Sequence, residues 1–150
     1  MKLGMIGLGR MGGNMAERLI SGGHHIVAYD SNDSAVAVLT EKGASAAESL
    51  SDVISQLDPP RTVWVMVPAG DITENTLNDL IEILDTGDTL IDGGNSNYKQ
   101  SIRRAEHARQ NGIDFLDSGT SGGIWGLGNG YCLTIGGNRQ AYDRNRPIFR

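Results

Sequence analysis

Gly7-Leu8-Gly9-Arg10-Met11-Gly12-Gly13 is the stretch that decides the fold of this chain. An apolar run from Leu3 to Ile6 precedes it, and a segment with helical periodicity from Met11 to Ile20 follows. A strand, a glycine turn and a helix in this order form the context of a dinucleotide-binding fingerprint. The first glycine would allow the tight turn, the second would let a pyrophosphate approach the backbone, and the third would let the helix pack on the strand. A purely structural turn is the alternative, but the positive end of the helix favours an anion.

The composition is that of a globular chain with room for one domain. It has 150 residues, of which 39% are hydrophobic, and no apolar run approaches the length of a membrane span. The formal net charge of −5 argues against a surface for nucleic acid. Met1-Lys2 leads straight into the first strand, unlike a signal peptide, and the single Cys132 excludes an internal disulfide. We therefore expect a cytoplasmic protein without nucleic-acid or membrane partners.

Strand and helix patterns alternate along the rest of the chain. Residues 62–67 are an apolar run between turn signals, which is typical of a strand buried on both faces. Further strands are predicted at 26–29, 89–92, 113–116 and 131–135. Helices are predicted at 11–20, 34–42, 49–56 and 73–84; a further helix follows the turn after residue 92 and ends at about 110, and a last one begins at 138. This order predicts an α/β fold of the Rossmann type, a doubly wound and mostly parallel sheet with helices on both faces. Residues 1–150 would form one dinucleotide-binding domain.

Asp30 ends the second predicted strand, 18 residues after Gly12. An acidic residue near this place accepts hydrogen bonds from the ribose hydroxyls of NAD and repels the 2′-phosphate of NADP. Ser31, Asn32 and Asp33 provide no basic side chain for that phosphate, so the sequence favours NAD over NADP. Asp30 as a helix N-cap is the alternative, although Asn32 or Asp33 can cap the helix instead.

Three polar loops follow predicted strands, and ligands gather at the carboxyl ends of strands in open α/β sheets. They are Pro68-Ala69-Gly70, Asp92 to Asn97, and Asp117 to Gly126. Structural turns and helix caps are the alternatives for the first two. In the third loop, Ser121 with its two glycines offers a hydroxyl and open N–H groups to a carboxylate or sugar hydroxyl, and Trp125 could pack over the ligand.

Other residues are expected to have structural roles. Helix 73–84 should turn Ile72, Thr76, Leu80 and Ile83 inward. Two sets of charged residues should form solvated faces. The acidic set is Asp71, Glu74, Asp79, Glu82, Asp85 and Asp88, and the basic set is Lys99, Arg103, Arg104 and Arg109. Cys132 should be a small buried hydrophobe. His24 and His25 have no ligands at metal-binding spacing nearby, so we expect no metal.

Four motifs together resemble a known family. They are Gly-Leu-Gly-Arg-Met-Gly at 7–12, Val-Pro-Ala-Gly at 67–70, Ile-Asp-Gly-Gly-Asn-Ser at 91–96 and Ser-Gly-Thr-Ser-Gly-Gly at 118–123. The chain resembles the amino-terminal domain of 6-phosphogluconate dehydrogenase, within the β-hydroxyacid dehydrogenase superfamily. The NADP-dependent branch has Asn-Arg-Thr in place of Asp30-Ser31-Asn32 and Glu-Glu in place of Ile124-Trp125. Both departures resemble the shorter, NAD-preferring branch.

The resemblance also implies site residues and a reaction. Cofactor contacts would come from Gly7, Leu8, Gly9, Arg10, Met11, Gly12, Asp30, Ser31, Val67, Pro68, Ala69 and Asn95. Sugar-acid contacts would come from Asn95, Ser121, Gly122 and Gly123. The implied reaction is the oxidative decarboxylation of 6-phosphogluconate to ribulose 5-phosphate with reduction of NAD, as in the pentose phosphate pathway and gluconate utilization.

The family's catalytic lysine and glutamate would lie beyond Arg150, on a helix of a C-terminal all-helical domain. That domain also completes the substrate pocket and forms the family's homo-oligomer. The chain is therefore expected to be a fragment that binds NAD without turnover. Two other interpretations stay open: a sister enzyme acting on a smaller 3-hydroxy acid, as 3-hydroxyisobutyrate dehydrogenase does, and a nucleotide-sensing module without catalysis.

Overall fold

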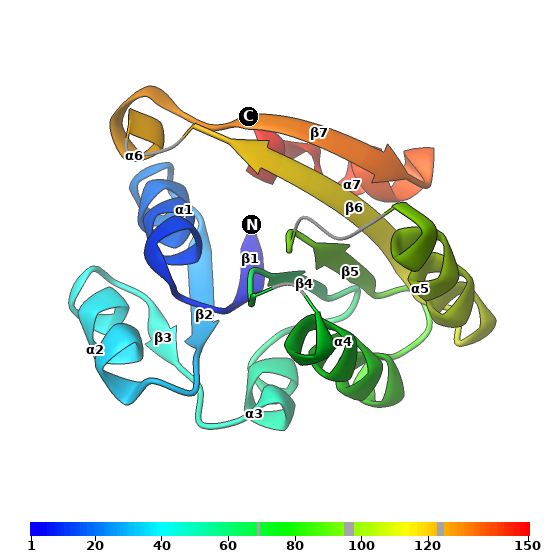
Figure 1. The fold of residues 1–150 in the computed structure, drawn as a ribbon. Helices are drawn as coiled ribbons and strands as arrows, with labels where there is room; N and C mark the ends of the chain where they lie inside the picture. The colour runs from blue at the N-terminus through cyan, green and yellow to red at the C-terminus, as the bar shows by residue number, and fades with distance from the viewer. Residues whose placement is uncertain (69, 95–97, 123–124) are drawn as a thin grey trace.

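The computed structural model describes residues 1–68, 70–94, 98–122 and 125–150, and these residues form a seven-stranded sheet flanked by helices (Figure 1). The strands are β1 (Lys2–Ile6), β2 (His25–Tyr29), β3 (Ser45–Ala46), β4 (Thr62–Val65), β5 (Thr89–Asp92), β6 (Asp114–Ser121) and β7 (Cys132–Gly137). The helices are α1 (Arg10–Ser21), α2 (Asp33–Glu41), α3 (Leu50–Ser55), α4 (Asp71–Ile83), α5 (Tyr98–Gln110), α6 (Gly126–Asn129) and α7 (Arg139–Phe149).

The strand order in the sheet is β3-β2-β1-β4-β5-β6-β7. All neighbouring pairs from β3 to β6 are parallel, and β7 alone among the described strands pairs antiparallel. The order reverses at β1, which pairs with β2 on one side and with β4 on the other. In a doubly wound sheet this reversal opens a crevice at the carboxyl ends of the strands. The predicted Rossmann-type fold is confirmed.

Apolar side chains pack against both faces of the sheet, as the apolar run at residues 62–67 predicts. On one face α3, α4 and α5 cover Val63, Val65 and Leu90. On the other face α1, α2 and α7 cover Leu3, Met5 and other alternate residues of the same strands. Because successive side chains point to opposite faces, one strand supplies both clusters. Figure 1 shows the helices divided between these two sides.

The carboxyl-terminal half of β6 differs from the prediction. Residues 117–121 were expected in a loop, but they continue β6 and pair with β7, from Asp117 opposite Gly136 to Ser121 opposite Cys132. Cys132 was expected to be buried, yet it is exposed. Cys132 and Thr134 point outward from β7, whereas Leu133 and Ile135 pack against the apolar cluster that contains Leu3 and Met5. The pairing partner, rather than local composition, makes this segment a strand.

Two expectations about inward and solvated faces were wrong in part, although Leu80 of α4 is buried as expected. The buried residues of α4 are Thr73, Leu77, Leu80 and Ile81, so its inward face is offset from Ile72 and Thr76, and Ile72 is 56% exposed. The charged residues Asp88 and Arg104, expected on solvated faces, are buried. Each has an ion-pair partner: Arg61 for Asp88, and Glu74 and Asp92 for Arg104. Pairing compensates the loss of hydration that burial imposes on a charge.

Candidate functional site

A cleft of about 920 Å³ opens at the carboxyl ends of β1, β2, β4 and β5. This is the place where a doubly wound sheet binds its ligand, and the volume lies within the range of small-molecule sites. Residues from the glycine turn, from the end of β2, from the loops after β4 and β5, and from α4 surround it. The lining consists of Ile6, Gly7, Gly9, Arg10, Met11, Gly12, Tyr29, Asp30, Ser31, Leu50, Met66, Val67, Pro68, Ile72, Thr76, Asp79, Gly93 and Gly94.

The glycines of the turn have three different environments. Gly7 has a φ of 92°, and a Cβ there would lie 2.6 Å from the carbonyl carbon of Met66. A Cβ at Gly12 would collide with the carbonyl oxygen of Gly7, so this glycine lets α1 pack against the turn. A Cβ at Gly9 would meet no atom of the described residues within 4 Å, and Gly9 faces the cleft. The space over Gly9 is therefore where a ligand can approach the backbone.

Gly9 is also the N-cap of α1, and among the described residues no side chain caps this end. The first turn of α1 contains no acidic residue. The backbone N–H groups at the start of α1 and the positive end of the helix dipole therefore face the cleft, with no acidic residue in that first turn to compete for them. This arrangement suits a phosphate group.

The carboxylate of Asp30 joins the end of β2 to the glycine turn. Its Oδ2 accepts a hydrogen bond from the backbone N–H of Leu8 at 2.6 Å, and its Oδ1 accepts one from the N–H of Asn32 at 2.8 Å. The side chain of Asn32, rather than Asp30, caps α2 by accepting from the N–H of Ser34. Asp30 therefore lies in the cleft beside Ser31, and the alternative in which it caps the helix is wrong.

The loop after β4 and the start of α4 form the next wall of the cleft. Val67 and Pro68 line it, and the buried hydroxyl of Thr73 donates to the carbonyl oxygen of Pro68. Ala69, a predicted cofactor contact, lies outside the described residues. The contribution of α4 itself was not predicted: its Ile72, Thr76 and Asp79 line the cleft together with Leu50. The position of Ile72, directly after the loop that follows β4, indicates a residue of the cleft, but Ile72 was predicted to face the core.

At the end of β5, Gly93 and Gly94 line the cleft, and the N–H of Gly94 donates to Oδ1 of Asp92 at 2.9 Å. Asn95, predicted to contact both cofactor and substrate, lies outside the described residues. Asp92 pairs in register with Asp117 of the neighbouring strand β6. Burial raises the pKa of Asp117, and the negative charge of Asp92 raises it further, while the nearby Arg104 opposes the change.

The predicted substrate residues at the end of β6 do not line this cleft. Ser121 and Gly122 are exposed beside the start of β7, and Gly123 lies outside the described residues. Trp125, considered as a cover for the ligand, is 70% exposed at the start of α6. The structure thus brings together the described cofactor residues of the prediction except Leu8, whose side chain is buried in the core, and leaves the substrate residues apart from them.

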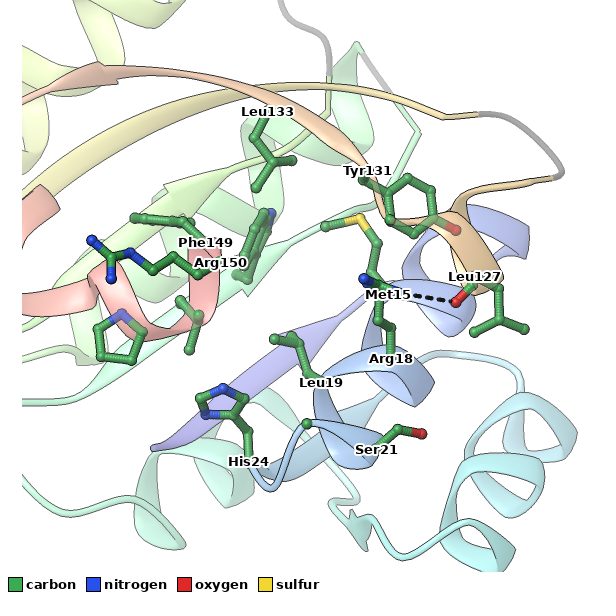
Figure 2. A pocket seen from close by; sticks show the side chains of 15 residues that line it. Met15, Arg18, Leu19, Ser21, His24, Leu127, Tyr131, Leu133, Phe149 and Arg150 are labelled. Carbon is green, nitrogen blue, oxygen red and sulfur yellow. Dashed lines mark hydrogen bonds between the residues drawn. The ribbon is translucent and has the colours of Figure 1, made fainter.

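A second cavity of about 520 Å³ lies between α1, β7 and α7 (Figure 2). Aromatic side chains, among them Tyr131 and Phe149, line it with Met15 and Leu19 of α1. Arg18 at its edge donates to the carbonyl oxygen of Leu127 at 3.1 Å, which ties α1 to α6. None of the residues predicted to bind cofactor or substrate lies in this cavity.

Within the described ranges, no three His, Cys, Asp or Glu side chains are grouped as metal ligands. The helices in those ranges are too short or too polar to cross a membrane.

Comparison with known proteins places the chain in a family. The model of the NAD-binding domain of 6-phosphogluconate dehydrogenase matches residues 2–150. The chain belongs to this family. It is 44% identical, over 149 residues, to the NAD⁺-dependent, decarboxylating 6-phosphogluconate dehydrogenase of Haloferax volcanii, and the match covers 99% of this chain and 49% of that protein. The chain therefore spans about half the length of this relative of the 6-phosphogluconate dehydrogenase family.

Solved structures agree with this assignment. The 6-phosphogluconate dehydrogenase of Plasmodium falciparum, studied with its cofactor NADP⁺ and its substrate, is 28% identical with a TM-score of 0.90 over 99% of this chain and 33% of that one. The 3-hydroxyisobutyrate dehydrogenase of Mycobacterium tuberculosis also has a TM-score of 0.90, over 99% of this chain and 50% of that one, but at 23% identity it shows the fold alone. The chain is thus the NAD-binding domain of a 6-phosphogluconate dehydrogenase-like oxidoreductase, in a family whose members differ in cofactor.

Proposed function

We propose that this chain is the cofactor-binding part of an enzyme that oxidatively decarboxylates 6-phosphogluconate to ribulose 5-phosphate, with NAD as its preferred cofactor. The reaction is supported by the similarity to 6-phosphogluconate dehydrogenases, and the choice of NAD is supported by the carboxylate of Asp30, which lies in the cleft and accepts a hydrogen bond from the N–H of Leu8. A carboxylate here suits a ribose with free hydroxyls and repels a 2′-phosphate.

Asp30 retains the capacity to bind a ribose. An ionised carboxylate has about four lone-pair sites, and the N–H groups of Leu8 and Asn32 use two of them. The remaining sites would accept the two ribose hydroxyls, with Ser31 alongside. The open backbone at Gly9 would receive the pyrophosphate at the start of α1. The apolar side chains of Leu50 and Ile72 would contact the adenine.

The nicotinamide end of the cleft would lie between the loops after β4 and β5. Val67, Pro68 and Ala69 would contact this part of the cofactor from one loop, and Asn95 from the other. Bound NAD supplies the acceptor for the hydride that leaves the substrate. Ser121, Gly122 and Gly123, with Asn95, would contact the sugar acid.

The acid and base of the reaction would come from a helical domain outside residues 1–150, which would also complete the substrate pocket and form the homo-oligomer. We accordingly expect the 150-residue chain to bind NAD without catalysing turnover. The whole protein would work in the cytoplasm, and a reducing buffer reproduces that condition. Hydride transfer needs a proton acceptor near the substrate hydroxyl, and in this proposal the helical domain supplies it.

Calorimetric titration of the chain with NAD⁺ and with NADP⁺ tests the cofactor assignment. NAD⁺ should bind more tightly, and equal affinities or a preference for NADP⁺ would show that Asp30 does not face the ribose. A longer protein that contains the helical domain should oxidise 6-phosphogluconate faster than 3-hydroxyisobutyrate. The opposite order would support the sister-enzyme interpretation instead.

A further inference from the structure

A buried ion-pair network connects α4, α5 and β5 behind the nicotinamide end of the cleft. The Arg104 side chain of α5 is only 2% exposed. Its Nε donates to Oε2 of Glu74 at 2.7 Å, and its Nη1 donates to Oδ2 of the fully buried Asp92 at 3.1 Å. One guanidinium thus joins the first turns of α4 to the last residue of β5.

Both carboxylates of this network adjoin a loop that lines the cleft. The second oxygen of Asp92 accepts the N–H of Gly94, at the start of the loop after β5. Glu74 follows Thr73, whose hydroxyl holds the carbonyl of Pro68 in the loop after β4. The network therefore reaches the backbone of both loops.

The two loops also touch each other at Gly94. A Cβ at this position would lie 3.2 Å from Oδ1 of Asp92, 3.3 Å from the Thr73 hydroxyl and 3.3 Å from the carbonyl oxygen of Val67. A small change in the distance between α4 and β5 would change this contact directly. The spacing of the two loops consequently depends on what holds α4, α5 and β5 together.

Packing alone does not require charges in this place. Buried ion pairs lose hydration and are often no more stabilising than apolar side chains of similar size. The third carboxylate nearby, Asp117, lies opposite Asp92 in the sheet and adds negative charge that Arg104 must balance. A forked guanidinium that bonds two carboxylates in fixed directions gives defined geometry, which an apolar contact would not.

We propose that Arg104 is a positioning residue, which through Glu74 and Asp92 fixes the spacing between the loop that begins at Val67 and the loop that begins at Gly93. The nicotinamide half of the cofactor then depends on Arg104, whereas the adenosine half, at Gly9 and Asp30, does not. This assignment of the two halves rests on the proposed function.

The test compares two ligands, NAD⁺ and ADP-ribose, which lacks the nicotinamide. Glu74→Gln removes the negative charge that pairs with Arg104 and so weakens the link to α4, at a partly exposed residue where the variant should fold. Its affinity for NAD⁺ should fall about three- to thirtyfold, the range expected for coupled residues, with the affinity for ADP-ribose unchanged. Arg104→Lys keeps the positive charge but loses the planar guanidinium that bonds both carboxylates. Its affinity should therefore also fall for NAD⁺ and stay unchanged for ADP-ribose. Arg109→Met is the matched control, because Arg109 lies on the same helix, is 77% exposed and pairs with Glu106 one turn away.

Hydrogen exchange of the Gly94 amide gives a second readout that needs no nucleotide. Exchange should be faster in Glu74→Gln and Arg104→Lys than in the wild type and Arg109→Met. Equal loss of both ligands, no loss of either, or unchanged exchange at Gly94 would overturn the proposal. If the wild type binds neither nucleotide, the proposed function fails, and the exchange at Gly94 alone then decides whether Arg104 positions the loop.

Discussion

The carboxylate of Asp30 at the end of β2 accepts a hydrogen bond from the backbone N–H of Leu8, in the middle of the glycine turn, at 2.6 Å. One side chain thus shapes the turn and also faces the cleft in which the cofactor is proposed to bind. Binding and local structure are coupled at this residue, and substitutions there should affect both.

Asp30→Ala should weaken NAD⁺ binding and also lower the melting temperature. The two N–H groups that Asp30 satisfies lose their acceptor, and hydrogen bonds to charged groups contribute about 1.5–3 kcal/mol each. NADP⁺ should be less affected than NAD⁺, so the ratio of the two affinities should move toward one. Calorimetry and thermal unfolding measure these changes, with the exposed Asp58→Ala as control. An unchanged NAD⁺/NADP⁺ ratio would contradict the role of Asp30.

Gly9→Ala and Gly12→Ala should separate binding from folding. A methyl group at Gly9 meets no described protein atom but occupies the space proposed for the pyrophosphate, so NAD⁺ affinity should fall at least about tenfold. The φ of −60° at Gly9 is accessible to alanine, so its stability should change by no more than about 1 kcal/mol. Gly12→Ala should instead destabilise the fold by about 1–3 kcal/mol, because its methyl group collides with Gly7.

Gly128→Ala is the control for both glycine variants, since a Cβ there meets nothing within 4 Å and lies outside the cleft. Denaturant titration and NAD⁺ titration of the same samples give the two quantities. Tight NAD⁺ binding by Gly9→Ala would place the pyrophosphate elsewhere.

Ile72→Ala tests the contribution of α4 to the cleft. Ile72 is largely exposed in the free chain, so its truncation should leave the free energy of unfolding nearly unchanged. It should weaken NAD⁺ binding by about 1–2 kcal/mol if the side chain is covered by the adenine. Ile102→Ala, at an isoleucine of α5 that is also largely exposed, should change neither quantity. Identical NAD⁺ affinities for the two variants would mean that the adenine lies away from Ile72.

Asp117→Asn should change how the stability of the chain depends on pH. The pKa of Asp117 is raised in the folded chain above its ordinary value of 3.8, chiefly by burial and then by Asp92. The folded state therefore binds this proton more tightly, and the wild type loses stability as the pH rises from 3.8 through the raised pKa. The variant lacks this loss.

Urea unfolding of wild type and Asp117→Asn across this pH range measures the effect. The stability of the variant relative to the wild type should increase with pH and then level off. A difference that is constant in pH, or that shrinks as the pH rises, would contradict the assignment.

The sequence alone predicts the parts of this structure that depend on local pattern. The strand before Gly7, the helix after it and the strand at 89–92 follow from short-range spacing and residue type, and the same pattern narrows the cap of α2 to Asn32 or Asp33, of which Asn32 is the cap. The position of the cleft also follows, because the carboxyl ends of parallel strands share one edge of the sheet.

The features that could not be predicted depend on partners far away in the sequence. Residues 117–121 are polar and typical of a loop, but β7 folds back to pair with them. Arg104 lies in a basic run that suggests a solvated face, and only the packing of α5 on the sheet, chiefly on β6, brings it to Asp92. The buried face of α4 includes Thr73 and Leu77, whereas the prediction placed Ile72 on it. Ile72 is apolar because it lines the cleft, and not because it faces the core.

The outward direction of Cys132 on β7 has a practical consequence. It is the single cysteine of the sequence, its thiol is exposed, and in the ladder it is the partner of Ser121. A thiol-reactive fluorophore can therefore be attached at one defined point without mutagenesis, next to the segment proposed to contact the sugar acid. Its emission would report events at the end of β6 while NAD⁺ is titrated into the cleft.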